Sequence, residues 1–244
     1  MTAALIDASR VLHSESEISA AKLESERLGL CPCPDPTKYW DNLLSVRAIE
    51  AAGVGPSDPI VDLGCRSGIL LTWLHQRGYR SLHGCDIRAP LPPLRVAAQM
   101  GLWRTVVAGI SMYSRNATRM RRAPVERTGF PSSHFAAATC MSVVEHGVDI
   151  SAFVHEAARI LRPGGLLLVS TDYWPDKIDV GSLRRFEEAR GNDRIFDRAE
   201  LGALRDQAAQ AGMRLEGVTD FAADEAPIVF DGLRYTFAFL AFRR

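Results

Sequence analysis

Net charge is the first property that this sequence lacks. Its 29 lysine and arginine residues balance its 29 aspartate and glutamate residues, so the chain has no overall attraction to nucleic acid or to an anionic membrane surface, and we expect neither as a partner. It has no apolar run near the roughly 18 residues of a membrane-spanning helix. Its first residues also lack the basic and apolar regions of a signal peptide. These absences predict a globular cytoplasmic protein.

The sequence lacks the paired cysteines of a disulfide framework. The five cysteines are an odd number, and three of them fall in predicted strands or in a glycine turn: Cys65, Cys85 and Cys140. Such usage is typical of a reducing compartment. The other two, in Cys31-Pro32-Cys33-Pro34, have no second cysteine pair that could complete a zinc site. We therefore interpret that segment as a loop stiffened by proline.

Strands and helices alternate through most of the 244 residues. Apolar runs of strand length recur between segments with helical spacing, and glycine or proline separates them. Such alternation predicts an α/β fold that is doubly wound, with a mostly parallel sheet and helices on both faces. The predicted strands include 60–63, 81–85, 136–141, 166–171, 214–219 and 235–242, and the predicted helices include 68–77, 150–161 and 197–211.

Two segments interrupt this order and indicate the domain organisation. Residues 1–37 contain one or two short amphipathic helices and a proline-rich break, and we interpret them as an N-terminal helical segment or lid. Residues 88–129 are too many for one helix and one strand, and helix-compatible sequence reaches from about Leu94 to Arg122. We interpret 88–129 as an inserted helical region after the second strand of a single domain, 38–244.

The most specific pattern is a glycine turn between a strand and a helix. The strand that begins at Ile60 is followed by Gly64 and Gly68, and Asp86 ends the next predicted strand 18 residues later. A glycine turn after one strand and an acidic residue at the end of the next are the two parts of a site for an adenosine ribose. Because Arg66 stands where a pyrophosphate would require a further glycine, a cofactor without phosphate fits this turn better.

The run Asp62-Leu63-Gly64-Cys65-Arg66-Ser67-Gly68 resembles motif I of the class I, Rossmann-like methyltransferases that depend on S-adenosyl-L-methionine (SAM), whose usual form is D-x-G-x-G-x-G. Glu145-His146 after the fourth strand and the Arg-Pro-Gly-Gly turn at 162–165 are also similar to that family. The resemblance covers about 38–244. It implies a seven-stranded sheet with an antiparallel last strand, SAM as the cofactor and S-adenosyl-L-homocysteine as its product.

The resemblance also implies which residues hold the cofactor. Asp86 would hold the ribose, and Ile87 would pack on the adenine. The glycine turn would line the methionine part. The full set of implied cofactor contacts is Asp62, Gly64, Cys65, Gly68, Asp86, Ile87, Met141 and Ser142.

A hydroxyl acceptor needs a base, because an alcohol is a poor nucleophile until its proton leaves. His146 is our candidate, with Glu145 beside it, since the pair follows a strand whose carboxyl end faces the pocket. Alternatively, the pair only starts a helix or contacts the cofactor. Carboxylates near this point could also hold Mg²⁺. The candidate metal ligands are Glu145, Asp149, Asp172 and Asp176.

Aromatic residues beside carboxylates suggest where the acceptor binds. Flat apolar faces next to hydrogen-bonding oxygens suit sugars and other polyols. The loop after the fifth strand, with two aromatic residues and two acids, is similar to sugar and natural-product O-methyltransferases. The candidate acceptor contacts are Tyr39, Trp40, Asp172, Tyr173 and Trp174.

We therefore predict a SAM-dependent methyltransferase that O-methylates a hydroxyl of a saccharide or of a small-molecule metabolite, as a monomer or a homodimer. Three alternatives stay open at this point: N-methylation, O-methylation of a non-sugar metabolite, and SAM binding without catalysis. A role for Mg²⁺ as a second cofactor also stays open.

Overall fold

The computed structural model describes residues 9–66, 68–88, 101–114, 118–181, 193–217 and 220–244. Its strands are β1 (Arg10–Val11), β2 (Ile60–Leu63), β3 (Leu82–Asp86), β4 (Thr118–Arg122), β5 (Phe135–Met141), β6 (Leu161–Tyr173), β7 (Arg214–Glu216), β8 (Ile228–Phe230) and β9 (Leu233–Arg243). Its helices are α1 (Glu15–Arg27), the short 3-10 helix η1 (Pro36–Lys38), α2 (Tyr39–Ala51), α3 (Ile69–Gln76), α5 (Trp103–Ser114), α6 (Ile150–Ile160) and α7 (Arg198–Gln210).

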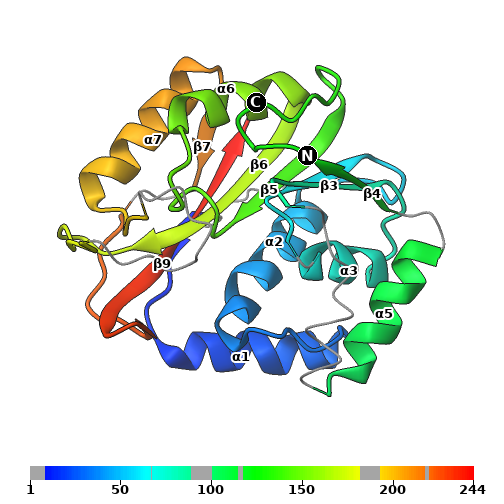
Figure 1. The fold of residues 1–244 in the computed structure, drawn as a ribbon, viewed down its shortest axis with the longest axis horizontal. Helices are drawn as coiled ribbons and strands as arrows, with labels where there is room; N and C mark the ends of the chain where they lie inside the picture. The colour runs from blue at the N-terminus through cyan, green and yellow to red at the C-terminus, as the bar shows by residue number, and fades with distance from the viewer. Residues whose placement is uncertain (1–8, 67, 89–100, 115–117, 182–192, 218–219) are drawn as a thin grey trace.

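One sheet of nine strands runs through the described part of the chain, and helices pack on both of its faces (Figure 1). The strand order is β1-β9-β6-β5-β2-β3-β4, and the short strands β7 and β8 also pair with β9. Neighbours from β4 to β6 are parallel, whereas every strand that pairs with β9 is antiparallel to it. The predicted doubly wound, mostly parallel α/β fold with an antiparallel last strand is confirmed.

The sheet has nine strands instead of the seven that the resemblance implied. The additional strands are β1 and β8, which are two and three residues long and both pair with β9. Segments this short carry no alternating pattern from which a strand could be predicted. The other seven strands match the number that the resemblance implied.

The predicted helical region after the second strand contains α5 and then returns to the sheet. Thr118–Arg122, which we expected to be helical, forms β4 and pairs in parallel with β3. Arg119 and Arg121 are exposed on alternate positions, as charged residues often are on an edge strand. Residues 89–100 and 115–117 of the predicted insertion lie outside the described residues.

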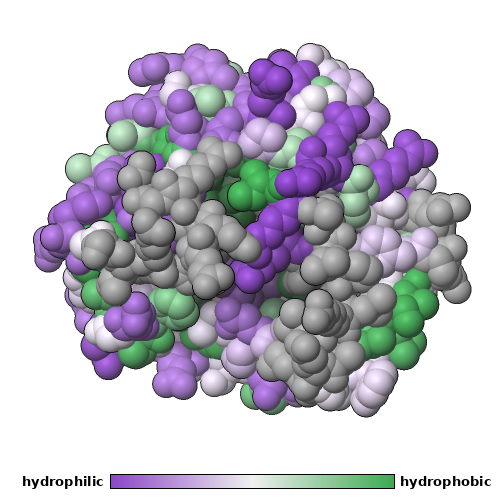
Figure 2. Space-filling view, in the orientation of Figure 1, coloured by the Kyte–Doolittle hydropathy of each residue, from purple (hydrophilic) through white to green (hydrophobic). Residues whose placement is uncertain are grey.

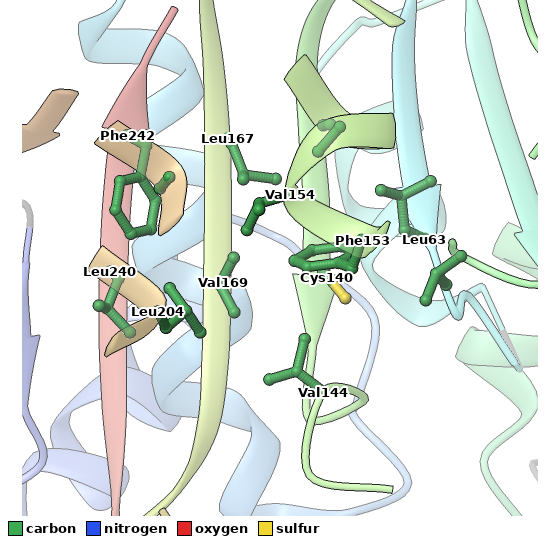
Figure 3. Close-up of a cluster of buried hydrophobic side chains, with 14 of the residues drawn as sticks. Leu63, Cys140, Val144, Phe153, Val154, Leu167, Val169, Leu204, Leu240 and Phe242 are labelled. Carbon is green, nitrogen blue, oxygen red and sulfur yellow. The ribbon is translucent and has the colours of Figure 1, made fainter. Parts of the chain in front are cut away.

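The side chains of the central strands alternate between two hydrophobic layers. In β6, Leu167 and Val169 belong to the layer under α6 and α7, whereas Leu166 and Leu168 belong to the layer that α2 and α3 cover. Figure 3 shows the first of these layers, with the side chains of β6 and β9 facing the two helices. A strand that is buried on both faces has a continuous apolar run in sequence, as this one does.

The N-terminal segment contributes a strand as well as a helix. β1 pairs with the edge of β9 that faces away from β6. Ser9 Oγ donates to Glu216 O at 2.6 Å in β7 and accepts from Ala241 N at 3.0 Å in β9. Helix α1 packs on α2, where Trp40 Nε1 donates to Glu17 Oε2 at 3.2 Å. The segment is therefore joined to the sheet at one end and to a core helix at the other.

Helix α5 presents an apolar stripe to solvent. Trp103, Val107 and Ile110 are 66%, 64% and 50% exposed, and their spacing places them on one side of the helix. Figure 2 shows a hydrophobic patch over α5 on an otherwise mixed surface. Among the described residues, no helix is both long and apolar enough to cross a membrane.

Candidate active site

The carboxyl ends of β2, β3, β5 and β6 meet at one edge of the sheet, where open α/β sheets bind their ligands. A cavity of about 500 Å³ lies there, and its size is typical of small-molecule sites. Its walls come from the glycine turn, from the ends of β5 and β6, from the segment before α2 and from β8 and β9. The lining residues are Cys33, Pro34, Asp35, Thr37, Lys38, Asn42, Asp62, Gly64, Cys65, Arg66, Ile69, Leu70, Met141, Ser142, Glu145, His146, Asp172, Phe230, Tyr235 and Phe237.

The glycine turn after β2 has no room for a side chain at its first glycine. Gly64 has a φ of +78°, and a Cβ atom there would lie 2.4 Å from Val143 Cγ2. The amide groups of Gly64 and Cys65 both donate to Cys85 O, at 2.8 and 3.1 Å, so the turn is tied to the end of β3. The turn therefore presents closely approachable backbone to the cavity.

Asp86 lies beside this turn at the end of β3. Its Oδ2 atom accepts from Arg66 N at 2.9 Å, and its Oδ1 atom accepts from Arg88 N at 3.0 Å. Arg66, the residue that departs from the motif, has a left-handed backbone with a φ of +37°. Its contact with Asp86 is made through the backbone amide group. Within the described part of the chain, neither Asp86 nor Ile87 lines the cavity itself, and Ile87 is half-exposed.

Asp62 lines the cavity close to the turn, in surroundings that favour a neutral carboxyl. It is 5% exposed, and its Oδ1 atom accepts from Thr139 Oγ1 at 2.7 Å. Burial raises the pKa of Asp62 to about 7; the hydrogen bond from Thr139 lowers it, and the charge of Asp86 raises it. The acidic residue of motif I can therefore change its charge near neutral pH.

Lys38 is a cavity residue that no sequence motif indicated. Its Nζ atom donates to Ser142 Oγ, lies 3.5 Å from Asp41 Oδ2 and lies 3.7 Å from the centre of the Phe237 ring. Asp41 is fully buried and accepts from Ser170 Oγ at 2.7 Å. The lysine thus joins the start of α2 to the ends of β5 and β6 and to β9.

The ammonium group of Lys38 stays protonated in this setting. Burial lowers its pKa, but the carboxylates of Asp41, Asp172 and Glu145 outweigh burial, and the net shift is upward. Lys38 can therefore donate hydrogen bonds into the cavity, but it is poorly suited to remove a proton from an acceptor.

His146 lines the cavity from the turn after β5, and its ring contacts a residue that we did not predict. Nδ1 of His146 lies 3.1 Å from Asp193 Oδ1, and the side chains are 26% and 2% exposed respectively. Glu145 is buried next to it, and its Oε2 atom accepts from Thr171 Oγ1 at 3.2 Å. Both predicted catalytic residues thus line the same cavity as the glycine turn.

The structure divides the predicted acceptor residues. Asp172 lines the cavity, whereas the four aromatic residues pack in the hydrophobic clusters and are absent from its lining: Tyr39, Trp40, Tyr173 and Trp174. Aromatic side chains bury a large apolar area, so packing in the core competes with ligand contact for them. The aromatic surface of the cavity comes instead from β8 and β9, through Phe230, Tyr235 and Phe237.

The four candidate metal ligands do not form one cluster, since only two of them line the cavity. Asp149 is the N-cap of α6, where it accepts from Ala152 N at 3.1 Å, and Asp176 is exposed. Glu145 and Asp172 both line the cavity. Among the residues that the structure describes, no group of three or more histidine, cysteine or acidic side chains could hold a metal ion.

Two of the lining residues are thiols. Burial raises the pKa of Cys33 and of Cys65 above the usual range, so neither is set up as a nucleophile. All five cysteines are free and buried. Thiol chemistry therefore has no support in this cavity.

The fold, the site and the family model together define a class I, Rossmann-like methyltransferase, the class whose cofactor is SAM. The glycine turn after the first parallel strand and the acidic residue at the end of the next lie side by side, as that class requires. Residues 38–216 match the family described as a methyltransferase domain, and the chain belongs to that family.

The curated proteins reported as similar to this chain are named ubiquinone biosynthesis O-methyltransferases. The ubiquinone biosynthesis O-methyltransferase of Hahella chejuensis (strain KCTC 2396) is 31% identical over 145 residues, which are 55% of this chain and 56% of that protein. The chain thus spans about half the length of the curated relatives it matches.

Two solved structures share the fold. Geranyl diphosphate C-methyltransferase from Streptomyces coelicolor A3(2), in complex with Mg²⁺, geranyl diphosphate and S-adenosyl-L-homocysteine, has a TM-score of 0.56 and 18% identity, over 95% of this chain and 84% of that chain. The 1,6-didemethyltoxoflavin-N1-methyltransferase of Burkholderia thailandensis has a TM-score of 0.52 and 16% identity, over 96% and 91% of the two chains. At these identities the similarity shows the fold alone.

Proposed function

We propose that this protein transfers a methyl group from SAM to a hydroxyl group of a small molecule. One observation carries the proposal: the backbone of the glycine turn and the side chain of His146 line a single cavity. Family membership supports methyl transfer. A hydroxyl acceptor requires a general base, and histidine is the side chain that most often fills that role. A neutral amine already has a reactive lone pair, so an N-methyltransferase would have less need of this residue.

The cofactor end of the cavity follows from the turn after β2. When bound, SAM supplies an electrophilic methyl group on a positively charged sulfur, which suits a wall that contains several carboxylates. We expect the turn to line the methionine part, Asp86 to accept hydrogen bonds from the ribose and Ile87 to pack on the adenine. The remaining contacts in this proposal are Asp62, Gly64, Cys65, Gly68, Met141 and Ser142.

The acceptor would lie between His146 and the aromatic side chains of β8 and β9. Phe230 offers a flat apolar surface there, and Asp172 offers a carboxylate. A hydroxylated aromatic ring suits this wall, and the curated relatives are named O-methyltransferases of ubiquinone biosynthesis. A saccharide is the second candidate, because Asp172 can accept hydrogen bonds from ring hydroxyls that lie against an aromatic face.

The cysteines support a reducing compartment as the place of the reaction. All five are free and buried in the structure. Free thiols persist in reducing compartments. We therefore place the reaction in the cytoplasm.

Calorimetry with SAM and S-adenosyl-L-homocysteine tests the cofactor site. We expect Asp86→Ala to weaken SAM binding by about tenfold or more, because hydrogen bonds to a charged group contribute about 1.5–3 kcal/mol each. Asp58→Ala is a matched control, since Asp58 precedes β2 and lies at its opposite end. Unchanged affinity of Asp86→Ala would remove the ribose assignment, and a wild-type chain that does not bind SAM would refute the proposed activity.

Methyl transfer from labelled SAM to phenols, saccharides and amines tests the acceptor. Turnover of a phenol or saccharide that is lost in His146→Gln would support O-methylation with a histidine base. If an amine is methylated, and His146→Gln keeps that activity, N-methylation would replace O-methylation as the function. SAM binding without turnover of any acceptor would favour a SAM-binding protein without catalysis.

A further inference from the structure

We propose that Asp193 is a positioning residue that holds His146 in the tautomer and orientation needed to take the acceptor's proton, an inference that rests on the proposed O-methyl transfer. The two residues are 47 positions apart in sequence, yet His146 Nδ1 lies 3.1 Å from Asp193 Oδ1. They also form an antiparallel backbone bridge. The pair is therefore joined through both side chains and main chains.

The side-chain contact decides which ring nitrogen can react. An ionised carboxylate only accepts hydrogen bonds, so Nδ1 of His146 must carry a proton in order to bond to Asp193. A neutral imidazole has one such proton, and the basic lone pair is then on Nε2. After Nε2 has taken a second proton, the imidazolium lies next to a negative charge that stabilises it.

Asp193 is fixed from two sides. Arg194 N donates to Glu145 O at 3.0 Å, in the turn after β5, and Phe196 N donates to Asp172 O at 2.9 Å, at the end of β6. The segment 193–196 thus runs between two walls of the cavity. With a side chain that is 2% exposed, Asp193 is kept from water, so its charge is screened much less than that of a surface residue.

This geometry supports transfer of the acceptor's hydroxyl proton to His146. The O–H bond of the acceptor breaks, the proton goes to Nε2 of His146, and the electron pair stays on the acceptor oxygen. That oxygen bonds to the methyl carbon, whose bond to sulfur breaks with the pair left on sulfur. His146 then returns its proton to solvent, to which its side chain is 26% exposed.

Nuclear magnetic resonance of the ligand-free full chain tests the tautomer directly. Long-range ¹H–¹⁵N spectra distinguish the tautomers of the six histidines, and His146→Gln identifies the signal of His146 by its loss. We expect a neutral His146 protonated on Nδ1 in the wild type, and loss of that preference in Asp193→Ala. A wild-type His146 protonated on Nε2 would overturn the proposal, whether or not an acceptor is known.

Kinetics with an acceptor that the wild type methylates tests the consequence. We expect Asp193→Asn to lower kcat by about 10²–10⁴-fold, the range for general base catalysis, while SAM affinity measured by calorimetry stays the same. In the His146→Gln background the same substitution should have no further effect, because the base is already gone. Asp193→Glu keeps a carboxylate and should recover part of the activity.

Two controls separate this role from a structural one. Asp58→Asn removes a carboxylate that is paired with Arg162 at the other end of the sheet, and it should keep the wild-type kcat. Thermal unfolding confirms that each variant is folded. Wild-type kcat in Asp193→Asn, or an additive loss in the double variant, would overturn the proposal. A wild type that methylates no acceptor would instead refute the proposed function, and the tautomer measurement would still decide the pairing.

Discussion

Gly64 and Gly53 have similar left-handed backbones, with φ of +78° and +69°, but different surroundings. A Cβ atom at Gly64 would lie 2.4 Å from Val143 Cγ2, whereas nothing lies within 4 Å of one at Gly53. Gly53→Ala should cost about 1–2 kcal/mol of unfolding free energy through backbone strain. Gly64→Ala should cost more and should weaken SAM binding, because the turn has to move. Urea unfolding and calorimetry measure the two effects.

Val143→Ala provides a check on the cause. In the Gly64→Ala background it removes the methyl groups that the new Cβ would meet, so it should restore part of the lost stability. In the Gly53→Ala background it should restore nothing. Equal losses for the two glycine variants would show that strain at φ, and not the contact with Val143, controls the turn.

Asp62 should make stability fall as the pH rises. In the folded protein, burial raises the pKa of its carboxyl group to about 7. In the unfolded chain, the pKa has the ordinary value of 3.8. The unfolding free energy is therefore highest below about pH 4, where the carboxyl group is neutral in both states. It falls by up to about 4 kcal/mol as the pH rises from about 4 to about 7. Asp62→Asn cannot ionise, so its unfolding free energy relative to wild type should rise over this interval, as measured by urea unfolding.

Asp58 gives the comparison with the opposite sign. Hydrogen bonds from Arg162 lower its pKa, so its stabilising effect is present at neutral pH and is lost as the pH falls through that lowered value. Asp58→Asn should therefore be less stable than wild type at neutral pH and approach it in acid. If the unfolding free energies of Asp62→Asn and the wild type changed in parallel with pH, the raised pKa of Asp62 would be contradicted.

Local order in the sequence explains which site residues were predictable. Gly64 and His146 line the cavity and Asp86 lies beside the turn, because each follows a predicted strand and strand ends meet at one edge of the sheet. Asp193 and Lys38 were missed because their roles depend on partners from distant elements. Such pairings become visible only when the chain is folded.

At the scale of single elements, Asp149 tests capping against metal binding. Its Oδ1 atom accepts from Ala152 N in the first turn of α6. Asp149→Ala should lower the unfolding free energy by about 1 kcal/mol, whereas Asp149→Asn should keep it, since asparagine caps helices as well as aspartate does. Neither variant should alter the response of activity to magnesium. A loss of activity in both, restored by excess Mg²⁺, would instead support the metal role.

Elements with a clear apolar pattern were predicted closely, whereas two strands without one, β1 and β4, were not. Helices α3, α6 and α7 lie within one residue of their expected bounds. β4 was assigned to helix because Thr118–Arg122 contains only short, charged alternation, and its pairing with β3 decides its conformation. The same reason hides β1, whose two residues form a strand only against β9.

At the scale of the whole molecule, Ser9 joins two strands from distant parts of the chain. Its hydroxyl group bonds to Glu216 O and Ala241 N, so Ser9→Ala would leave polar groups of β7 and β9 without this partner. We expect a loss of about 1–3 kcal/mol in urea unfolding and faster amide exchange at Ala241. The exposed Ser16→Ala should stay within about 0.5 kcal/mol of wild type. Equal stability of the two variants would show that Ser9 does not hold the edge together.

The position of β9 has a consequence for biosynthesis. β9 pairs with β1, β6, β7 and β8, and it follows all four of them along the chain. During translation, the apolar edge of β6 and the short β1 segment therefore stay unpaired until residues 233–243 have been synthesised. An unpaired apolar strand edge is prone to aggregate. The pairing that protects this edge is therefore complete only after translation has passed β9.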